Sequence, residues 1–151
     1  MNLNLYDRFW FSAKIQSGKE VCGVECRIAY PPQLLEAVLD ENGGVQAQLG
    51  SFFSNGSRDT TMLNANLEDD KPGTLVLGLS KLGESQPQNG KGALFSVLFK
   101  CIGVGEGELR FEQSHIYNAE AKEVPSKWHG ANLQVVAINV VSAEIIPVEK
   151  G

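Results

Sequence analysis

Hydrophobic and polar residues alternate with a period of two along most of this chain. The clearest example is the segment GVECRIAY at 23–30, where Cys26 and Ile28 share one face and Glu25 and Arg27 share the other. Successive side chains of a β-strand point to opposite faces of its sheet, so the alternation predicts a strand with one buried and one outward face. Two prolines follow directly, and we expect them to end the strand because proline lacks a backbone N–H.

Similar alternation recurs along the chain, separated by turns rich in glycine, asparagine, aspartate and proline. The further strand candidates are 2–6, 9–15, 61–68, 74–82, 93–101, 107–117 and 131–141. Segment 34–40 fits either a helical turn or a strand, and 45–58 is expected to be a long loop. Eight or nine short strands separated by such turns are typical of an antiparallel sandwich, so we predict an all-β fold.

The composition is that of an ordinary globular domain. The chain has 151 residues, of which 42% are hydrophobic and 21% charged, and this length predicts one domain with its own core. The net charge of −5 argues against a nucleic-acid partner, since phosphate binding needs a basic face. No segment has the length and apolar character of a membrane span, and the N-terminal residues lack the basic start and apolar core of a signal peptide. We therefore expect neither nucleic-acid binding nor membrane insertion, and no signal peptide within this chain.

The three cysteines offer no clear disulfide framework. Cys22 and Cys26 fall in one predicted strand, which places them about 13 Å apart, whereas the Cα atoms of a disulfide lie about 4.4–6.8 Å apart. Cys26 and Cys101 both occupy inward positions and could meet across the core, but buried free thiols are favoured. No pair has the spacing of zinc ligands, so no metal site is expected.

Residues suited to catalysis are few and scattered. His115 lies in a predicted strand and His129 stands beside a glycine in a turn, and neither has a partner at ligand spacing. The glycine-rich stretch that begins at Gly103 is not followed by a helix, so it fits a hairpin turn better than a phosphate-binding loop. We therefore predict no catalytic residue and no enzymatic activity.

Several segments share their order and spacing with a known family. They are GVECRIAYPPQLLEAV at 23–38, KPGTLVLGLS at 71–80, GKGALFSVLFKC at 90–101, GELRFEQSHIY at 107–117 and GANLQV at 130–135. This set resembles the cohesin domains of cellulosomal scaffoldins and related surface proteins, and the likeness extends over residues 9–136. The first segment is similar to the family's Gly-x-x-apolar-x-apolar-x-Tyr-Asp-Pro-x-x-Leu pattern, with Pro31 in place of the aspartate.

The resemblance implies a nine-stranded jelly-roll β-sandwich for residues 1–136. Residues 137–151 continue past the usual end of the family, and we expect them either to pack on the sandwich or to begin a following domain. The implied function is that of a non-catalytic module that binds a dockerin, a small module with paired calcium loops, and recruits it to a scaffold or cell surface. Calcium would belong to the dockerin, and no cofactor is expected on this chain. The implied location is extracellular or at the cell surface, within a larger secreted protein.

The implied docking surface is the outer face of one sheet, formed by the third, fifth, sixth and eighth strands of the family. With the alternation, the resemblance selects Glu25, Arg27, Ala29, Asn64, Asn66, Val76, Gly78, Ser80, Arg110 and Glu112, together with Lys122 and Val124 from the loop after the eighth strand. We expect this face to be flat and rich in hydrogen-bonding groups. Arg27 is the leading candidate, because arginine is enriched at binding hot spots and its strand is central. For each residue, a merely solvated sheet face is the alternative.

The opposite sheet generates a second expectation. Trp10, Leu94 and Leu98 are predicted to point outward together, which would make an apolar surface. Either the C-terminal residues 137–151 fold over it, or it is open to a neighbouring module or a polysaccharide. Two other classes of function stay open, a carbohydrate-binding module and a structural spacer of a surface protein. The aromatic residues available for stacking on sugars, Trp10, Tyr117 and Trp128, lie on different segments, which disfavours the carbohydrate-binding module.

Overall fold

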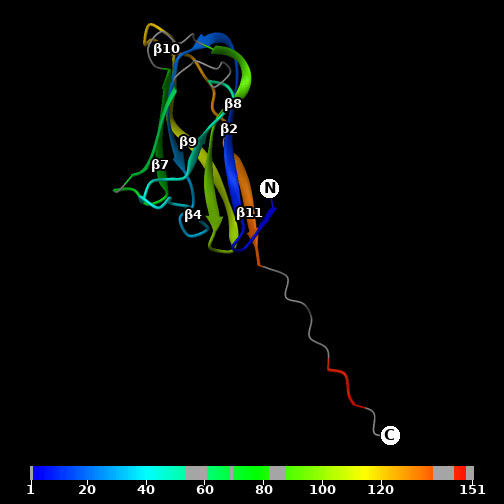
Figure 1. Cartoon of the computed structure of the whole chain (residues 1–151). Helices are drawn as coiled ribbons and strands as arrows, with labels where there is room; N and C mark the ends of the chain where they lie inside the picture. Colours follow the sequence, from blue (N-terminus) through cyan, green and yellow to red (C-terminus); the bar gives the residue numbers. More distant parts are fainter. Residues whose placement is uncertain (1, 54–60, 69, 82–87, 138–144, 149–151) are drawn as a thin grey trace.

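Two β-sheets stacked face to face form the protein (Figure 1). The structure is a computed structural model that describes residues 2–53, 61–68, 70–81, 88–137 and 145–148. The first sheet has the strand order β1 (Asn2–Asn4), β11 (Ala131–Val136), β9 (Gly105–Tyr117), β3 (Gly23–Ala29), β7 (Thr74–Lys81) and β6 (Thr61–Leu67), and β10 (Glu123–Val124) pairs with β9. The second sheet has the order β2 (Arg8–Val21), β8 (Gln88–Cys101) and β4 (Leu35–Ala37), and β5 (Ala47–Leu49) also pairs with β8. Every pairing is antiparallel except the parallel pair β1–β11.

This architecture confirms the predicted all-β sandwich. The described residues form eleven strands rather than nine, and four of them, β1, β4, β5 and β10, are short pairings of two or three residues. Segment 34–40 contains β4, which resolves its ambiguity in favour of a strand. The predicted loop 45–58 contains β5 and two buried phenylalanines, and its residues 54–58 lie outside the described part. Within the described ranges, no helix is long and apolar enough to cross a membrane.

The period-two alternation places one face of each central strand in the core. On β3, the inward side chains of Val24, Cys26 and Ile28 are at most 1% exposed. Strands β7 and β8 contribute in the same way, with Leu75, Leu77, Leu79, Phe95, Val97 and Phe99. Each fully buried aliphatic or aromatic side chain stabilises the fold by about 1.5–3 kcal/mol, so these strands hold the two sheets together.

The end of β3 is fixed by a turn against the start of β7. Strand β3 ends at Ala29, before the two prolines, as predicted. The N–H of Tyr30 then donates to the carbonyl oxygen of Gly73 at 2.8 Å. Gly73 has a φ of +82°, and a Cβ there would lie 2.4 Å from the Tyr30 carbonyl oxygen, so glycine is required for this close approach. The contact locks the register between β3 and β7.

The prediction that Leu94 belongs to an exposed apolar patch on the second sheet is wrong. The pairing of β2 with β8 shifts by one residue between Ala13 and Lys14, which is a β-bulge in β8. The bulge turns Leu94 inward, where it is 1% exposed, while Trp10 is 43% exposed and Leu98 is half-buried. The three residues therefore do not form a common exposed surface, and the described residues give no support for a neighbouring module there.

The C-terminal residues 145–148 are exposed. Ile145, Ile146 and Val148 have relative exposures of 93%, 78% and 92%. Residues 138–144 and 149–151 lie outside the described part of the chain, so the expectation that 137–151 packs on the sandwich or begins another domain stays a prediction.

The three cysteines are free thiols, and two of them are deep in the core. Cys26 and Cys101 are buried, and Cys22 is half-buried at the start of β3. Burial raises the pKa of the Cys26 thiol from 9.0 to about 12. The pKa of Cys101 is also raised, first by burial and then by the negative charge of Asp7. The Cys26 thiol therefore holds its proton in the folded protein well above the pH at which an exposed thiol releases its own, and the pKa of Cys101 is shifted in the same direction.

We expect the protein to lose stability above about pH 9, partly through Cys26. Between pH 9.0 and about 12 the folded state retains the Cys26 proton, while the unfolded state releases it. Unfolding is then coupled to proton release, and the free energy of unfolding should fall by up to about 1.4 kcal/mol per pH unit for this one group. Urea unfolding of the protein and of Cys26→Ala across this range should show a shallower slope for the variant. Parallel slopes would contradict the burial of this thiol.

Candidate functional site

The strands β9, β3, β7 and β6 present one continuous outer face, which we call the polar face. Their register aligns outward residues in rows across the sheet, and the row nearest the middle contains His115, Glu25, Gly78 and Asn64. The neighbouring rows contain Tyr117, Gly23 and Ser80 on one side, and Glu112, Arg27, Val76 and Asn66 followed by Arg110 and Ala29 on the other. The sheet thus brings together side chains from four separate parts of the sequence.

Ten of the twelve predicted site residues lie on this face. They are Glu25, Arg27, Ala29, Asn64, Asn66, Val76, Gly78, Ser80, Arg110 and Glu112. Lys122 is exposed just beyond β9, in a turn held by the Asn118 side-chain oxygen, which accepts from the N–H groups of Glu120 and Lys122. Val124 instead packs against the core from β10, so it does not belong to the polar face. Its place in the loop that follows the predicted strand 107–117 gave no sign that this side chain points inward.

The sequence analysis missed His115 and Tyr117 as members of the polar face. Continued alternation from Glu112 would point both side chains inward, but β9 carries a bulge where Gln113 has a φ of +45° and the register with β3 shifts. The bulge buries Ile116 and turns its two neighbours outward. A signal was present in the spacing, because the apolar residues of β9 change from odd to even positions at Ile116.

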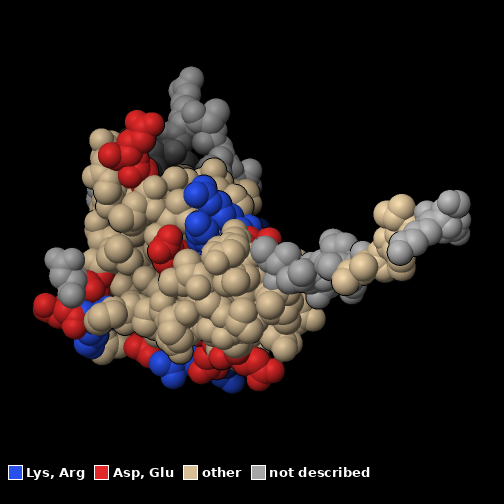
Figure 2. Space-filling model, turned by 90° about the horizontal axis from the view of Figure 1, so that it is seen from below, with Lys and Arg blue, Asp and Glu red and all other residues tan. Residues whose placement is uncertain are grey.

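Ion pairs within the sheet engage both arginines of the polar face. Nη1 of Arg27 lies 2.5 Å from Oε2 of Glu68, and Arg110 contacts Glu112 at 3.0 Å and Glu108 at 3.6 Å. Figure 2 shows the same tendency on the surface seen from below, where Lys and Arg side chains lie beside Asp and Glu. Exposed ion pairs contribute roughly 0–1 kcal/mol each, so they orient the arginines more than they stabilise the fold.

The polar face also carries more carboxylates than guanidinium groups. Its strands carry the carboxylates of Glu25, Glu108 and Glu112 against the guanidinium groups of Arg27 and Arg110. Glu68 follows β6, and Glu123 on the adjoining β10 contacts His115 Nδ1 at 2.6 Å. Among the described residues, Glu25 has no cation in ion-pair contact. The face therefore carries surplus negative charge, which favours a partner surface with basic residues.

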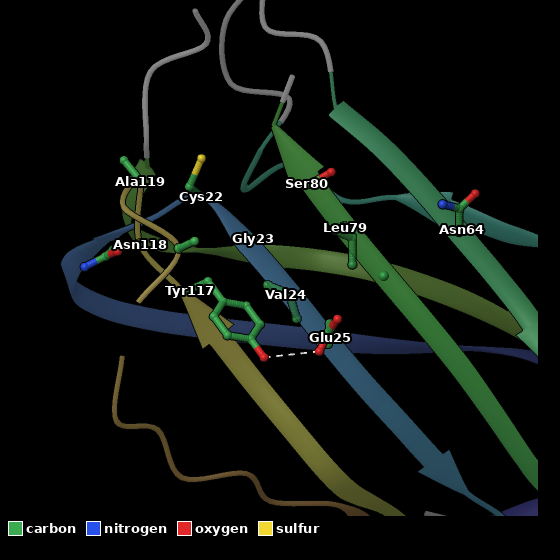
Figure 3. Close-up of a pocket in the computed structure, with 12 residues that line it drawn as sticks. Cys22, Gly23, Val24, Glu25, Asn64, Leu79, Ser80, Tyr117, Asn118 and Ala119 are labelled. Atoms are coloured by element: carbon green, nitrogen blue, oxygen red, sulfur yellow. Dashed lines mark hydrogen bonds between the residues drawn. The ribbon is translucent and has the colours of Figure 1, made fainter. Parts of the chain in front are cut away.

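Glu25 is held by a hydrogen bond from the neighbouring strand. The hydroxyl of Tyr117 donates to Oε2 of Glu25 at 3.1 Å (Figure 3). The pKa of Tyr117 is raised, first by removal of solvent around the phenol, then by its hydrogen bond to the Glu25 carboxylate, and further by the charges of Glu25 and Glu123. The phenol is thus a stable donor at neutral pH, and it fixes the position of the carboxylate.

Two adjoining hollows, both shallow and open to solvent, lie on the polar face. The first has a volume of about 430 Å³ and lies over Gly23 and Gly78, between Tyr117 and Asn64 (Figure 3). The second, of about 330 Å³, begins on the other side of Glu25 and extends past Arg27. Gly78 explains the depression, because a Cβ built there would meet no heavy atom within 4 Å.

The described residues do not assemble a metal-binding cluster. No group of three His, Cys, Asp or Glu side chains in the described ranges could hold a metal ion. The aromatic residues that might stack on a sugar are separated: Trp10 lies on the second sheet, and Trp128 packs on Phe111 with ring centroids 5.0 Å apart. The chemistry that the polar face offers is hydrogen bonding and charge.

Solved structures similar to this one are cohesin modules. A non-cellulosomal cohesin from the archaeon Archaeoglobus fulgidus has a TM-score of 0.69 and 17% sequence identity, over 89% of this chain and 85% of that chain. The second type II cohesin module of the adaptor ScaA scaffoldin of Acetivibrio cellulolyticus has a TM-score of 0.68 and 17% identity, over 95% and 92%. A type II cohesin-X-dockerin complex from the same organism has a TM-score of 0.66 and 17% identity, over 88% and 87%. No protein-family model and no curated protein matches the chain. The protein therefore has the cohesin β-sandwich fold that its sequence motifs implied.

The contact between Glu25 and Tyr117 has a direct spectroscopic test. Glu25→Gln removes the negative charge beside the phenol, so the pKa of Tyr117 should move down toward the ordinary value for tyrosine. NMR of tyrosine labelled at Cζ would follow Tyr117 separately from Tyr30 and Tyr6 during an alkaline titration. Glu41→Gln, an exposed carboxylate in a turn outside the polar face, should leave the titration of Tyr117 unchanged. A titration of Tyr117 that is insensitive to Glu25→Gln would show that the two side chains are apart.

Proposed function

We propose that this protein is a non-catalytic binding module that docks a dockerin-bearing protein on the polar face. The observation that carries the proposal is the sheet order β9-β3-β7-β6, which presents the predicted outward residues as one polar surface on a cohesin fold. A solved structure with this fold is a complex of a type II cohesin with a dockerin. Docking in the present protein would recruit the partner to a scaffold or cell surface.

The size and chemistry of the polar face support this function. Standard protein–protein interfaces bury roughly 800 Å² per partner, an area that four adjacent strands can offer. The outward side chains are mostly polar or small, and Val76 is half-buried among them. Binding would therefore depend on hydrogen bonds and charge complementarity around a few central groups rather than on a large apolar patch.

The proposal assigns calcium to the partner and an extracellular setting to the complex. Calcium-binding loops use several oxygen ligands from carboxylates and carbonyls, and the described part of this chain brings together no cluster of that kind. The dockerin would carry the ions, and this chain would need no cofactor. We place the module outside the cell or at its surface, as part of a larger secreted protein.

Binding should depend on calcium through the partner alone. Isothermal titration of the purified protein with dockerins of its source organism should give a saturable one-to-one complex in calcium, and chelation should abolish it because the dockerin loops lose their ligated ions. The same chelator should leave the melting temperature of this protein unchanged. Failure of every dockerin of the source organism to bind in calcium would contradict the proposed function, and retention on cellulose or glycan gels would favour a carbohydrate-binding module instead.

Arg27→Ala should weaken dockerin binding by about 1–3 kcal/mol. The guanidinium of Arg27 lies in the row beside the middle of the polar face and is oriented by Glu68, so its loss removes a charged donor that is already in position. The fold should persist, because the pair is partly exposed and such pairs contribute little to stability. Arg8→Ala, at an exposed position of β2 in the second sheet, is the matched control and should bind normally. Equal affinities for the Arg27 and Arg8 variants would show that Arg27 is not part of the interface.

A further inference from the structure

The larger hollow of the polar face combines an open floor with one fixed carboxylate. Its floor is the backbone of β3 and β7 at Gly23 and Gly78, two positions that have no side chain. Tyr117 forms one wall, Asn64 lies on the opposite side, and the Glu25 carboxylate stands at the edge (Figure 3). The hollow is a recess about 430 Å³ in volume, large enough to receive a long side chain.

The charge pattern around the hollow selects the chemistry of its occupant. The two arginines of the polar face are already paired with Glu68, Glu108 and Glu112, whereas Glu25 accepts a hydrogen bond from a neutral phenol. A neutral donor fixes the carboxylate but leaves its charge uncompensated. Of the described residues, none places a cation in ion-pair contact with Glu25.

We propose that this hollow receives one lysine or arginine side chain of the docked partner, with its charged group on the Glu25 carboxylate. The inference rests on the proposed function, since the partner is taken to be a dockerin. Lysine and arginine have long aliphatic stems that lie along apolar or backbone surface while the charged end reaches a polar group. The glycine floor accommodates the stem, and the carboxylate held by Tyr117 meets the head without reorganisation.

Other occupants fit the hollow less well. An acidic side chain would be repelled by Glu25 and by the surplus carboxylates of the polar face. A purely apolar side chain would fill the space but would bury the Glu25 carboxylate without a cationic partner, which is costly. Charge complementarity therefore distinguishes a basic residue from the alternatives.

Two substitutions in this protein test separately the charge of Glu25 and the open space of the hollow. Glu25→Gln keeps the size of the side chain and removes its charge, so dockerin affinity should fall about tenfold to a hundredfold. Gly78→Leu fills the hollow, and it should weaken binding by a similar factor without disturbing the fold, since nothing lies within 4 Å of the added Cβ. Glu41→Gln and Gly18→Leu are the matched controls, because Gly18 on β2 also has open space around it. Melting temperatures of all four variants verify that they fold.

A double-mutant cycle then identifies the partner residue. Each lysine and arginine of the bound dockerin is replaced in turn by alanine and measured against this protein and against Glu25→Gln. For one of these replacements, the loss of affinity should be at least about fivefold smaller against Glu25→Gln than against the unmodified protein. If Glu25→Gln binds as tightly as the unmodified protein and no replacement is coupled to it, the inference is wrong while dockerin binding stands.

A small-molecule titration tests the hollow without a dockerin. N-acetyl-arginine amide at millimolar concentration should shift the NMR signals of the Gly23 and Gly78 amides, and these shifts should be lost in Glu25→Gln. N-acetyl-norleucine amide, which has an apolar side chain, should produce much smaller shifts. If no dockerin binds but the arginine shifts are seen, the proposed function is wrong and the cation-accepting hollow stands; if the arginine and norleucine compounds act alike, the hollow does not select a cation.

Discussion

Strand β3 is hydrogen-bonded along both edges, to β7 on one side and β9 on the other, and this double pairing constrains the rest of the molecule. A strand held on both edges cannot slip by one residue without exchanging its two faces. Its inner side chains, Val24, Cys26 and Ile28, are buried almost completely, so the cost of such a slip would be the exposure of the centre of the core. The outward positions of Glu25 and Arg27 follow from the same constraint. Core packing on one side of β3 thus fixes the polar face on the other.

Local departures from regular strand geometry shape that face. The bulge at Gln113 turns His115 and Tyr117 outward, which supplies the hydroxyl that holds Glu25. The absence of a side chain at Gly78 leaves open space beside the same carboxylate. Both features depend on backbone conformation and residue size, and together they turn a sheet surface into a recess with one oriented charge. Shape and charge at a single place are what allow a sheet face to select its partner.

Alternation predicted the two faces of regular strands, because a period of two follows directly from strand geometry. The outward residues that it selected on β3, β6 and β7 lie where it predicted, and the structure confirms the predicted sandwich. It failed where one residue is inserted, at Leu94 in β8 and after Glu112 in β9, because a bulge reverses the faces beyond it. The sequence also could not reveal which carboxylate pairs with Arg27, since Glu68 lies 41 positions away and becomes a neighbour only when β6 and β7 close the sheet. The position of Val124 depended on β10 pairing with β9, a two-residue pairing too short to leave a pattern.

The central claim is that the outer surface of β9, β3, β7 and β6 is the face that meets the partner. NMR cross-saturation from an unlabelled dockerin to the isotopically labelled protein measures this surface residue by residue. The account predicts that the saturated amides cluster on β3, β6, β7 and β9, with the strongest effects around Gly23, Glu25 and Gly78. Saturation centred on β2 and β8 of the second sheet, with these residues unaffected, would contradict it.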